Sequence, residues 1–212
     1  MRYDIRLMPG NDALTEGGLS LVFFVDDVRM CVLSFSIVPT SLVMPEPAAL
    51  LEEAGLLRPT IPYVARRHTT RDRDWQNAFN KAFDRTTPSH LCFGALSGLA
   101  VAQGHRLVMG ITAERHAYWS PATAEQFQTT YTEFWESLGG RPVSPYGYVF
   151  EVPLEGRPLE DMPAAKRKRA LARRAHAEAV QRSAEAVIGA LLRPREGSAT
   201  HAGASVGMPL SA

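Results

Sequence analysis

The sequence contains few of the residues that bind metals or form disulfides. Its 212 residues include two cysteines, Cys31 and Cys92, each inside an apolar run and without the spacing of a metal-binding motif. Free cysteines in such runs are usually buried, so we predict two reduced thiols in the core of a cytoplasmic protein. The six histidines are scattered, and no metal site is predicted.

Long apolar runs and an excess of one charge are also lacking. No stretch reaches the length of a membrane span, and the N-terminal residues lack the basic and apolar regions of a secretory signal. The 23 lysines and arginines balance 22 aspartates and glutamates, which leaves a net charge of +1. No transmembrane segment is therefore predicted, and nucleic acid is not an expected partner.

The hydrophobic patterns that are present predict one α/β domain over residues 1–160. Apolar residues make up 45% of the chain, enough for a core without disulfides or metal. The predicted strands are 3–8, 19–25, 29–37, 61–66, 106–112 and 146–152. The predicted helices are 48–57, 75–83, 88–102 and 120–138. This order favours a mixed, largely antiparallel sheet with helices packed on it.

Residues 88–138 form the most strongly patterned unit of the chain. Pro88 suits the first position of a helix, and Gly94 and Gly98 form a small strip for close packing. Gly104 supplies the positive φ that ends this helix, and the apolar strand 106–112 follows. We therefore expect this unit at the centre of the domain.

The composition changes near residue 161. Residues 161–193 are rich in alanine and arginine, which predicts a long helix, and residues 194–212 have the composition of a disordered tail. The helix carries a basic cluster suited to a protein partner or an anionic surface; the alternative is a solvated helix face. The cluster consists of Lys166, Arg167, Lys168, Arg169, Arg173 and Arg174.

A second polar cluster follows the strand 61–66, just before a helix. Anions commonly bind at this position in α/β folds, so a phosphate or carboxylate site is predicted. The alternative is a solvated turn paired with Asp72 and Asp74, since no glycine lets the backbone wrap around a phosphate. The members of the cluster are Arg66, Arg67, His68, Arg71 and Arg73.

The loop after the strand 106–112 holds two candidates for acid–base catalysis. Loops at strand ends often carry function, and Glu114 and His116 have side chains that can transfer protons. The alternative is a surface loop whose aromatic residues, Tyr118 and Trp119, pack on the sheet. No glycine-flanked serine marks a nucleophile elsewhere in the chain.

Several stretches resemble the VirK/YbjX family, bacterial proteins with a domain of unknown function. The matching stretches are EGGLSLVFF (16–24), VLSFSIV (32–38), YVARRHTTRDRDWQNAFNKAF (63–83), residues 88–116, and YTEFWESLGG (131–140) with the later KRKRALARR run. The resemblance implies a noncatalytic accessory or regulatory protein linked to virulence or envelope functions.

The chain also departs from this family in two ways. Family members are usually longer at the N-terminus, so the chain resembles a C-terminal portion or a short variant. Many members carry a Gln-Gly pair where this chain has residues 67–70, Arg-His-Thr-Thr. If that pair contacts a ligand, a different ligand is expected here.

The order of elements further resembles the second half of GNAT-type N-acyltransferases. The matching segments are FWESLGGRP (134–142) and YGYVFEV (146–152). The resemblance implies a GNAT-like fold that opens between the strands 61–66 and 106–112, and a donor that is acyl-CoA or acyl carrier protein. The two glycines of the family's phosphate-binding loop are absent here.

This second resemblance also assigns residues to an enzyme. It implies that Arg66, Arg67 and Arg71 hold the donor phosphates. Glu114, His116 or Tyr131 would then lie near the acceptor. Two functions remain open at this point: a noncatalytic accessory protein and an acyltransferase.

Overall fold

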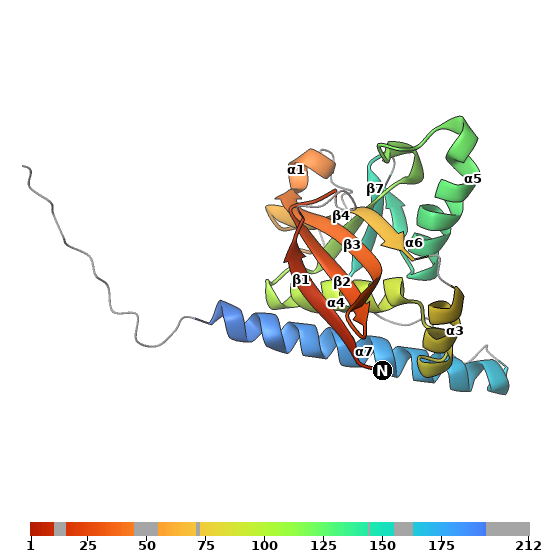
Figure 1. Cartoon of the computed structure of the whole chain (residues 1–212). Helices are drawn as coiled ribbons and strands as arrows, with labels where there is room; N and C mark the ends of the chain where they lie inside the picture. Colours follow the sequence, from red (N-terminus) through yellow and green to blue (C-terminus); the bar gives the residue numbers. More distant parts are fainter. Residues whose placement is uncertain (11–15, 45–54, 71–72, 144, 155–162, 194–212) are drawn as a thin grey trace, which may run out of the picture.

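The structure, a computed structural model, describes residues 1–10, 16–44, 55–70, 73–143, 145–154 and 163–193 (Figure 1). The predicted tail and most of the predicted helix 48–57 lie outside these residues. The described strands form a seven-stranded sheet in the order β1-β2-β3-β4-β5-β7-β6. They are β1 (Tyr3–Pro9), β2 (Leu19–Val25), β3 (Val28–Pro39), β4 (Thr60–Thr69), β5 (Leu107–Ile111), β6 (Arg141–Val143) and β7 (Gly147–Glu151).

All neighbouring strands of this sheet are antiparallel except β4 and β5, which are parallel. The predicted mixed, largely antiparallel sheet is therefore confirmed. Among the described strands, the short edge strand β6 was not predicted; it has three residues and contains Pro142. Proline is tolerated at a sheet edge, where its missing N–H is not needed, but a three-residue strand shows no alternation that a pattern could detect.

The hairpin between β2 and β3 turns where the sequence predicts it. Asp26 and Asp27 both have positive φ, 46° and 64°, and Val25 pairs directly with Val28. A two-residue turn with both central residues left-handed matches the right-handed twist of the flanking strands, and aspartate tolerates that conformation better than most residues. The hairpin brings the buried faces of β2 and β3 together in the core.

The helices that cover the sheet, directly or through another helix, differ in length. The main ones are α1 (Thr40–Val43), α3 (Arg73–Ala82), α4 (Pro88–Ala102) and α7 (Ala164–Leu192). The predicted helix 120–138 is divided into α5 (Ala124–Phe127), a π-helical turn (Gln128–Thr132) and α6 (Glu133–Ser137). Such π-helical turns are rare and often lie at functional sites.

Helix α4 lies between the sheet and α7, as Figure 1 shows. Its two glycines allow the helices to approach closely, because a Cβ on Gly94 would lie 3.2 Å from the backbone oxygen of Ala177. A Cβ on Gly98 would lie 2.1 Å from the backbone oxygen of Gln181. Ser97 adds a hydrogen bond, donated to the Gln181 Oε1 at 3.0 Å. The predicted glycine strip thus packs against α7.

The aromatic-glycine corner after α6 packs around Trp135, which is fully buried. Its indole Nε1–H donates to the carbonyl of Ile111 at 2.8 Å, which satisfies the one polar atom of the ring. A Cβ on Gly110 would lie 2.8 Å from this indole, and one on Gly140 would lie 2.5 Å from the Phe150 ring. The corner therefore needs glycine at both positions to admit the two rings.

The parallel strands β4 and β5 pair over a short distance and then separate. Their paired residues are Tyr63 with Met109 and Val64 with Gly110. On the other side of β4, the register with β3 shifts between Val64 and Arg66, so Ala65 forms a bulge. Beyond it, β4 continues along β3 to Thr69, whereas β5 ends at Ile111. Bulges of this kind often lie beside active sites.

Candidate functional site

A carboxylate, a guanidinium and an imidazole meet where β4 and β5 diverge. Arg66, just beyond the bulge in β4, donates from Nη1 to the Glu16 Oε1 at 3.0 Å. The other Glu16 oxygen lies 3.5 Å from the Nε2 of His116, which follows the 3₁₀ turn Ala113–Arg115 after β5. The Arg66 and Glu16 side chains are 17% and 24% exposed, so water screens their pairing only in part. We refer to these three residues as the Glu16 cluster.

The protonation of His116 follows from its surroundings. Its Nδ1 accepts the backbone N–H of Tyr118 at 3.2 Å, so the neutral ring carries its proton on Nε2, facing Glu16. Burial lowers the pKa of His116, and Arg66 lowers it further against the opposing effect of Glu16. His116 is thus neutral near pH 7, and its Nε2 faces the Glu16 carboxylate.

Aromatic rings enclose the imidazole on several sides. The His116 ring centroid lies 4.8 Å from that of Phe127, 5.0 Å from Tyr131 and 5.8 Å from Tyr118. Tyr118 is 63% exposed and lies under the Arg66 guanidinium at 5.3 Å. The cluster therefore has an apolar inner wall and an outer side open to solvent.

Tyr131 connects the π-helical turn to the bulged strand. Its hydroxyl accepts the backbone N–H of Arg67 at 3.4 Å, two residues beyond Ala65. Burial raises the pKa of this phenol to about 12, so it keeps its proton at neutral pH. A buried hydroxyl thus lies at the edge of β4 that faces the divergence.

Arg67 points away from the Glu16 cluster and has a structural role. Its Nε and Nη2 donate to the carbonyl of Thr130 at 3.1 and 2.6 Å, and its Nη1 donates to Ser89 at 3.0 Å. Its guanidinium also lies 4.3 Å over the Phe134 ring. All three nitrogens are engaged, so Arg67 holds the π-helical turn and the start of α4 against β4.

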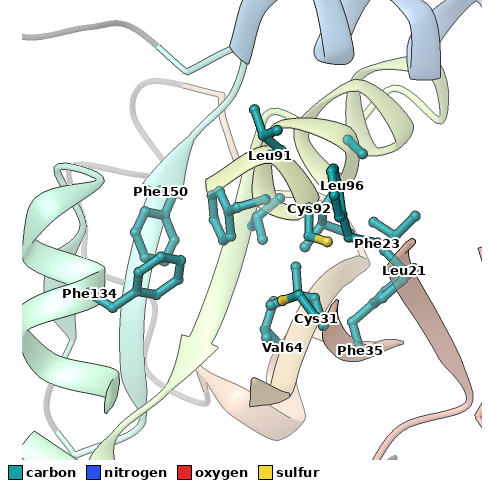
Figure 2. Close-up of a cluster of buried hydrophobic side chains, with 14 of the residues drawn as sticks. Leu21, Phe23, Cys31, Phe35, Val64, Leu91, Cys92, Leu96, Phe134 and Phe150 are labelled. Carbon is teal, nitrogen blue, oxygen red and sulfur yellow. The ribbon is translucent and has the colours of Figure 1, made fainter. Parts of the chain in front are cut away.

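Two small polar residues link Arg67 to the cysteines. The Ser89 hydroxyl lies 3.1 Å from the Thr69 hydroxyl and 3.4 Å from the Cys31 thiol. Cys31 and Cys92 are free and buried, as predicted. They also lie next to each other in the core (Figure 2). Hydrogen bonding from Cys92 lowers the pKa of Cys31, and the same contact raises that of Cys92.

The structure brings some of the predicted site residues together and leaves others apart. Arg66, His116 and Tyr131 meet at the divergence, whereas His68 is exposed at the end of β4. Glu114 is exposed, and its carboxylate contributes to the raised pKa of Tyr148, outside the cluster. Arg71 and the side chain of Arg73 lie outside the described part of the chain.

Sequence reasoning missed Glu16, the carboxylate at the centre of the cluster. It is 50 residues from Arg66 in the chain, so no local spacing joins the two. The signal that was available is its place in the segment EGG directly before β2, which is among the stretches that resemble the VirK/YbjX family. Only the pairing of β2, β3 and β4 brings it to the end of β4.

The predicted basic cluster lies on α7. Arg167, Lys168, Arg169 and Arg173 are exposed and Arg174 is half-buried, while Ala170 is buried. The side chain of Lys166 is outside the described residues. Helix α7 therefore packs on α4 along one face and presents these cations on its exposed surface.

Two further findings concern metals and membranes. Within the described ranges, no three histidine, cysteine, aspartate or glutamate side chains gather as a metal site. Among the same residues, no helix combines the length and apolar character that crossing a membrane requires.

The buried His90 should make the stability of the fold depend on pH. His90, in the first turn of α4, contacts Thr87 at 2.7 Å and Ser137 at 3.2 Å. Burial lowers its pKa to about 4, with Arg67 and Arg173 adding to the effect. An unfolded histidine has a pKa near 6.5, so the unfolded chain binds a proton more readily between these values.

We therefore expect the free energy of unfolding to fall as the pH drops from about 6.5 to about 4. For His90 alone the loss between pH 7 and pH 4.5 is about 2 kcal/mol. Urea unfolding at both pH values measures it, and H90Q should reduce the difference by that amount. An equal difference in wild type and H90Q would contradict this assignment. His105 and His116, whose pKa values burial also lowers, should keep part of the dependence in the variant.

Comparison with known proteins places the chain in a family. The model of the family described as "Protein of unknown function (DUF535)" matches residues 66–186, more than half of the chain. The match runs from Arg66 of the Glu16 cluster through α4, β5 and the aromatic-glycine corner into α7. No curated protein and no solved structure gives a match. The chain belongs to the VirK/YbjX family, whose members share this domain.

Proposed function

We propose that the chain binds a pantetheine-linked acyl donor between β4 and β5 and transfers the acyl group to an amine. One observation carries the proposal: the Glu16 cluster lies at the point where the parallel strands separate beyond the bulge at Ala65. The strand order and this single parallel pair also support the GNAT-like resemblance.

The backbone of β4 offers a place for the donor. Where two strands separate, the N–H and C=O groups at their facing edges need other partners. The N–H of Arg67 now binds the Tyr131 hydroxyl at 3.4 Å, a long hydrogen bond that an amide carbonyl of pantetheine can replace. The donor would then run along β4 and bring its thioester toward the Glu16 cluster.

The residues of the cluster suit the transfer step. The amine nitrogen attacks the thioester carbonyl, so that a C–N bond forms and the C–S bond breaks. Glu16 accepts the proton that the attacking nitrogen loses. The hydrogen bond from Arg66 orients the carboxylate, and the His116 Nε2 lies 3.5 Å from its other oxygen. The thiolate leaves with the bonding pair and takes a proton from solvent. Tyr131, protonated because its pKa is about 12, donates a hydrogen bond to that sulfur as it departs.

The assignment of the base predicts a difference between two carboxylates. E16Q should lower the rate of acyl transfer at least a hundredfold, because general-base catalysis contributes roughly 10²–10⁴-fold. E114Q is the matched control, since Glu114 is exposed and outside the cluster. Transfer from acyl-CoA and from acyl carrier protein is measured on a panel of amines, with unfolding midpoints to check folding. If E114Q loses activity and E16Q does not, the base is wrongly assigned.

A second function is supported by the cations on α7. Four cations are exposed on this helix: Arg167, Lys168, Arg169 and Arg173. This surface favours a noncatalytic accessory role for a cytoplasmic protein, in which an acidic partner or an anionic envelope surface binds α7. Charge reversal of Lys168 and Arg169 to glutamate should abolish co-purification of such a partner. Retained co-purification would remove α7 from this second proposal.

A further inference from the structure

An apolar cavity lies between the N-terminal hairpin and the two long helices, on the α4 side of the sheet. Its volume is about 490 Å³, within the range of small-molecule sites. Residues from β1, β2, α4 and α7 line it, including Ile5, Leu21, Leu91, Leu99, Val180 and Ile188. Leu21 and Leu91 also belong to the buried core cluster that Figure 2 shows. No residue of the Glu16 cluster lines it, so this site is separate from the proposed acyl-transfer site.

The lining residues show how far the cavity extends along each bordering element. Its residues on α4 run from Leu91 to Leu99, and those on α7 run from Val180 to Ile188. At 1.5 Å per residue, each helix borders the cavity over about 12 Å. On β1 the lining extends from Tyr3 to Leu7, over a similar length. A slot about 12 Å long that is bordered mostly by apolar side chains accommodates an extended hydrocarbon chain.

The polar content of the lining decides which ligand fits. Among the lining residues, Tyr3, Asp4 and Ser183 carry polar groups on their side chains. Asp4 is already engaged by Arg2 and Arg6, and the Tyr3 hydroxyl donates to the Met1 sulfur at 3.4 Å. A peptide in this slot would bring backbone N–H and C=O groups with few partners, which is costly. A hydrocarbon chain brings none. Burying such a chain against these apolar side chains is favourable.

We propose that this cavity binds the unbranched hydrocarbon chain of a fatty acid or lipid. The exposed apolar side chains of Leu7, Val187 and Leu191 adjoin it or lie just beyond it on the same elements. They extend the apolar surface outward, so a chain longer than the cavity still contacts protein at its outer end. The ligand is held by burial of methylene groups, and its head group remains outside.

Affinity should therefore depend on chain length. Each methylene buried tightens binding about fourfold, until the cavity is full. The measurement is displacement of a fluorescent fatty acid from the full chain by octanoate, decanoate and dodecanoate, each below its micelle concentration. The Kd values of dodecanoate and of its uncharged methyl ester should differ by less than about threefold. Affinity independent of chain length, or binding only of the charged acid, would overturn the proposal.

Two variants of α7 locate the site. Ala184 lines the cavity and Ala186, two residues along the same helix, is exposed. A184F should fill the slot and weaken dodecanoate at least tenfold without lowering the unfolding midpoint, because the added ring enters open space. A186F should leave binding unchanged. Equal binding by both variants would overturn the assignment.

Three further outcomes are decisive. Binding of E16Q equal to that of wild type supports a site distinct from the proposed catalytic one. If light scattering shows a dimer without fatty acid that A184F dissociates, a second copy occupies the slot and the proposal is wrong. Binding to phosphatidylglycerol vesicles gives the last outcome. If A184F binds the vesicles as well as wild type does, and dodecanoate does not displace either protein, the surface of α7 is the binding element and the proposal is wrong.

Discussion

G98V is expected to lower the free energy of unfolding by about 3 kcal/mol, with α7 released from α4. A Cβ at this position would lie 2.1 Å from the backbone oxygen of Gln181 and 3.0 Å from the backbone nitrogen of Glu185. These are backbone atoms, so no side-chain rotation can relieve the clash. The whole of α7 must move away, which exposes the apolar outer face of α4 to water.

Another glycine of the same helix pair supplies the control. Gly189, on α7, has no atom within 4 Å of where its Cβ would be. G189V should therefore change stability by less than about 0.5 kcal/mol. Urea unfolding gives both values, and limited proteolysis reports release of α7. Equal stability of G98V and G189V would show that α4 and α7 do not pack as closely as the structure has them.

R67M should destabilise the fold by about 3 kcal/mol at pH 7. The methionine keeps the apolar stem that packs near Phe134 but leaves the Thr130 carbonyl without its two hydrogen bonds from Arg67. It also removes the donor to Ser89. Hydrogen bonds to a charged group contribute about 1.5–3 kcal/mol each, and a buried acceptor left unpaired adds to the loss.

An exposed arginine separates this effect from the loss of a positive charge. Arg115 is exposed and lies 5.5 Å over the Tyr146 ring. R115M should cost less than about 1 kcal/mol, as expected for an exposed cation–π contact. Similar losses in R67M and R115M would mean that Arg67 does not hold the π-helical turn, and the account of the divergence would need revision.

The parts of the fold that were predictable depend on local pattern. The sequence predicts the hairpin at Asp26 and Asp27 because the turn residues are adjacent in the chain. It predicts the glycine strip of α4 because residues four apart share one helix face. The aromatic-glycine corner around Trp135 was recognisable as a motif before its packing was known. In each case the sequence near the element contains the physical cause.

The candidate site was less predictable because it depends on contacts across the chain. Arg66 and His116 were found by their places at strand ends, but Glu16 needed the register of three strands. The basic run at Arg66 and Arg67 looked like one anion site. Because the bulge precedes them and side chains alternate along a strand, these two arginines point to different sides of β4. Arg66 joins the Glu16 cluster, and Arg67 is buried against Thr130. The π-helical turn likewise has no signature in a helical pattern.

The central claim is that the divergence of β4 and β5 receives an acyl donor. Amide hydrogen exchange of the full chain, with and without a non-hydrolysable thioether analogue of acyl-CoA, tests it most directly. At a hundredfold excess over its Kd, the analogue should add about 2.7 kcal/mol to stability. The account predicts added protection at residues 65–69 and 113–119 beyond the general increase. Two results would contradict the presence of a donor site here. One is saturating binding of the analogue that protects neither segment, and the other is that the thioether analogues of acyl-CoA and acyl carrier protein both fail to bind.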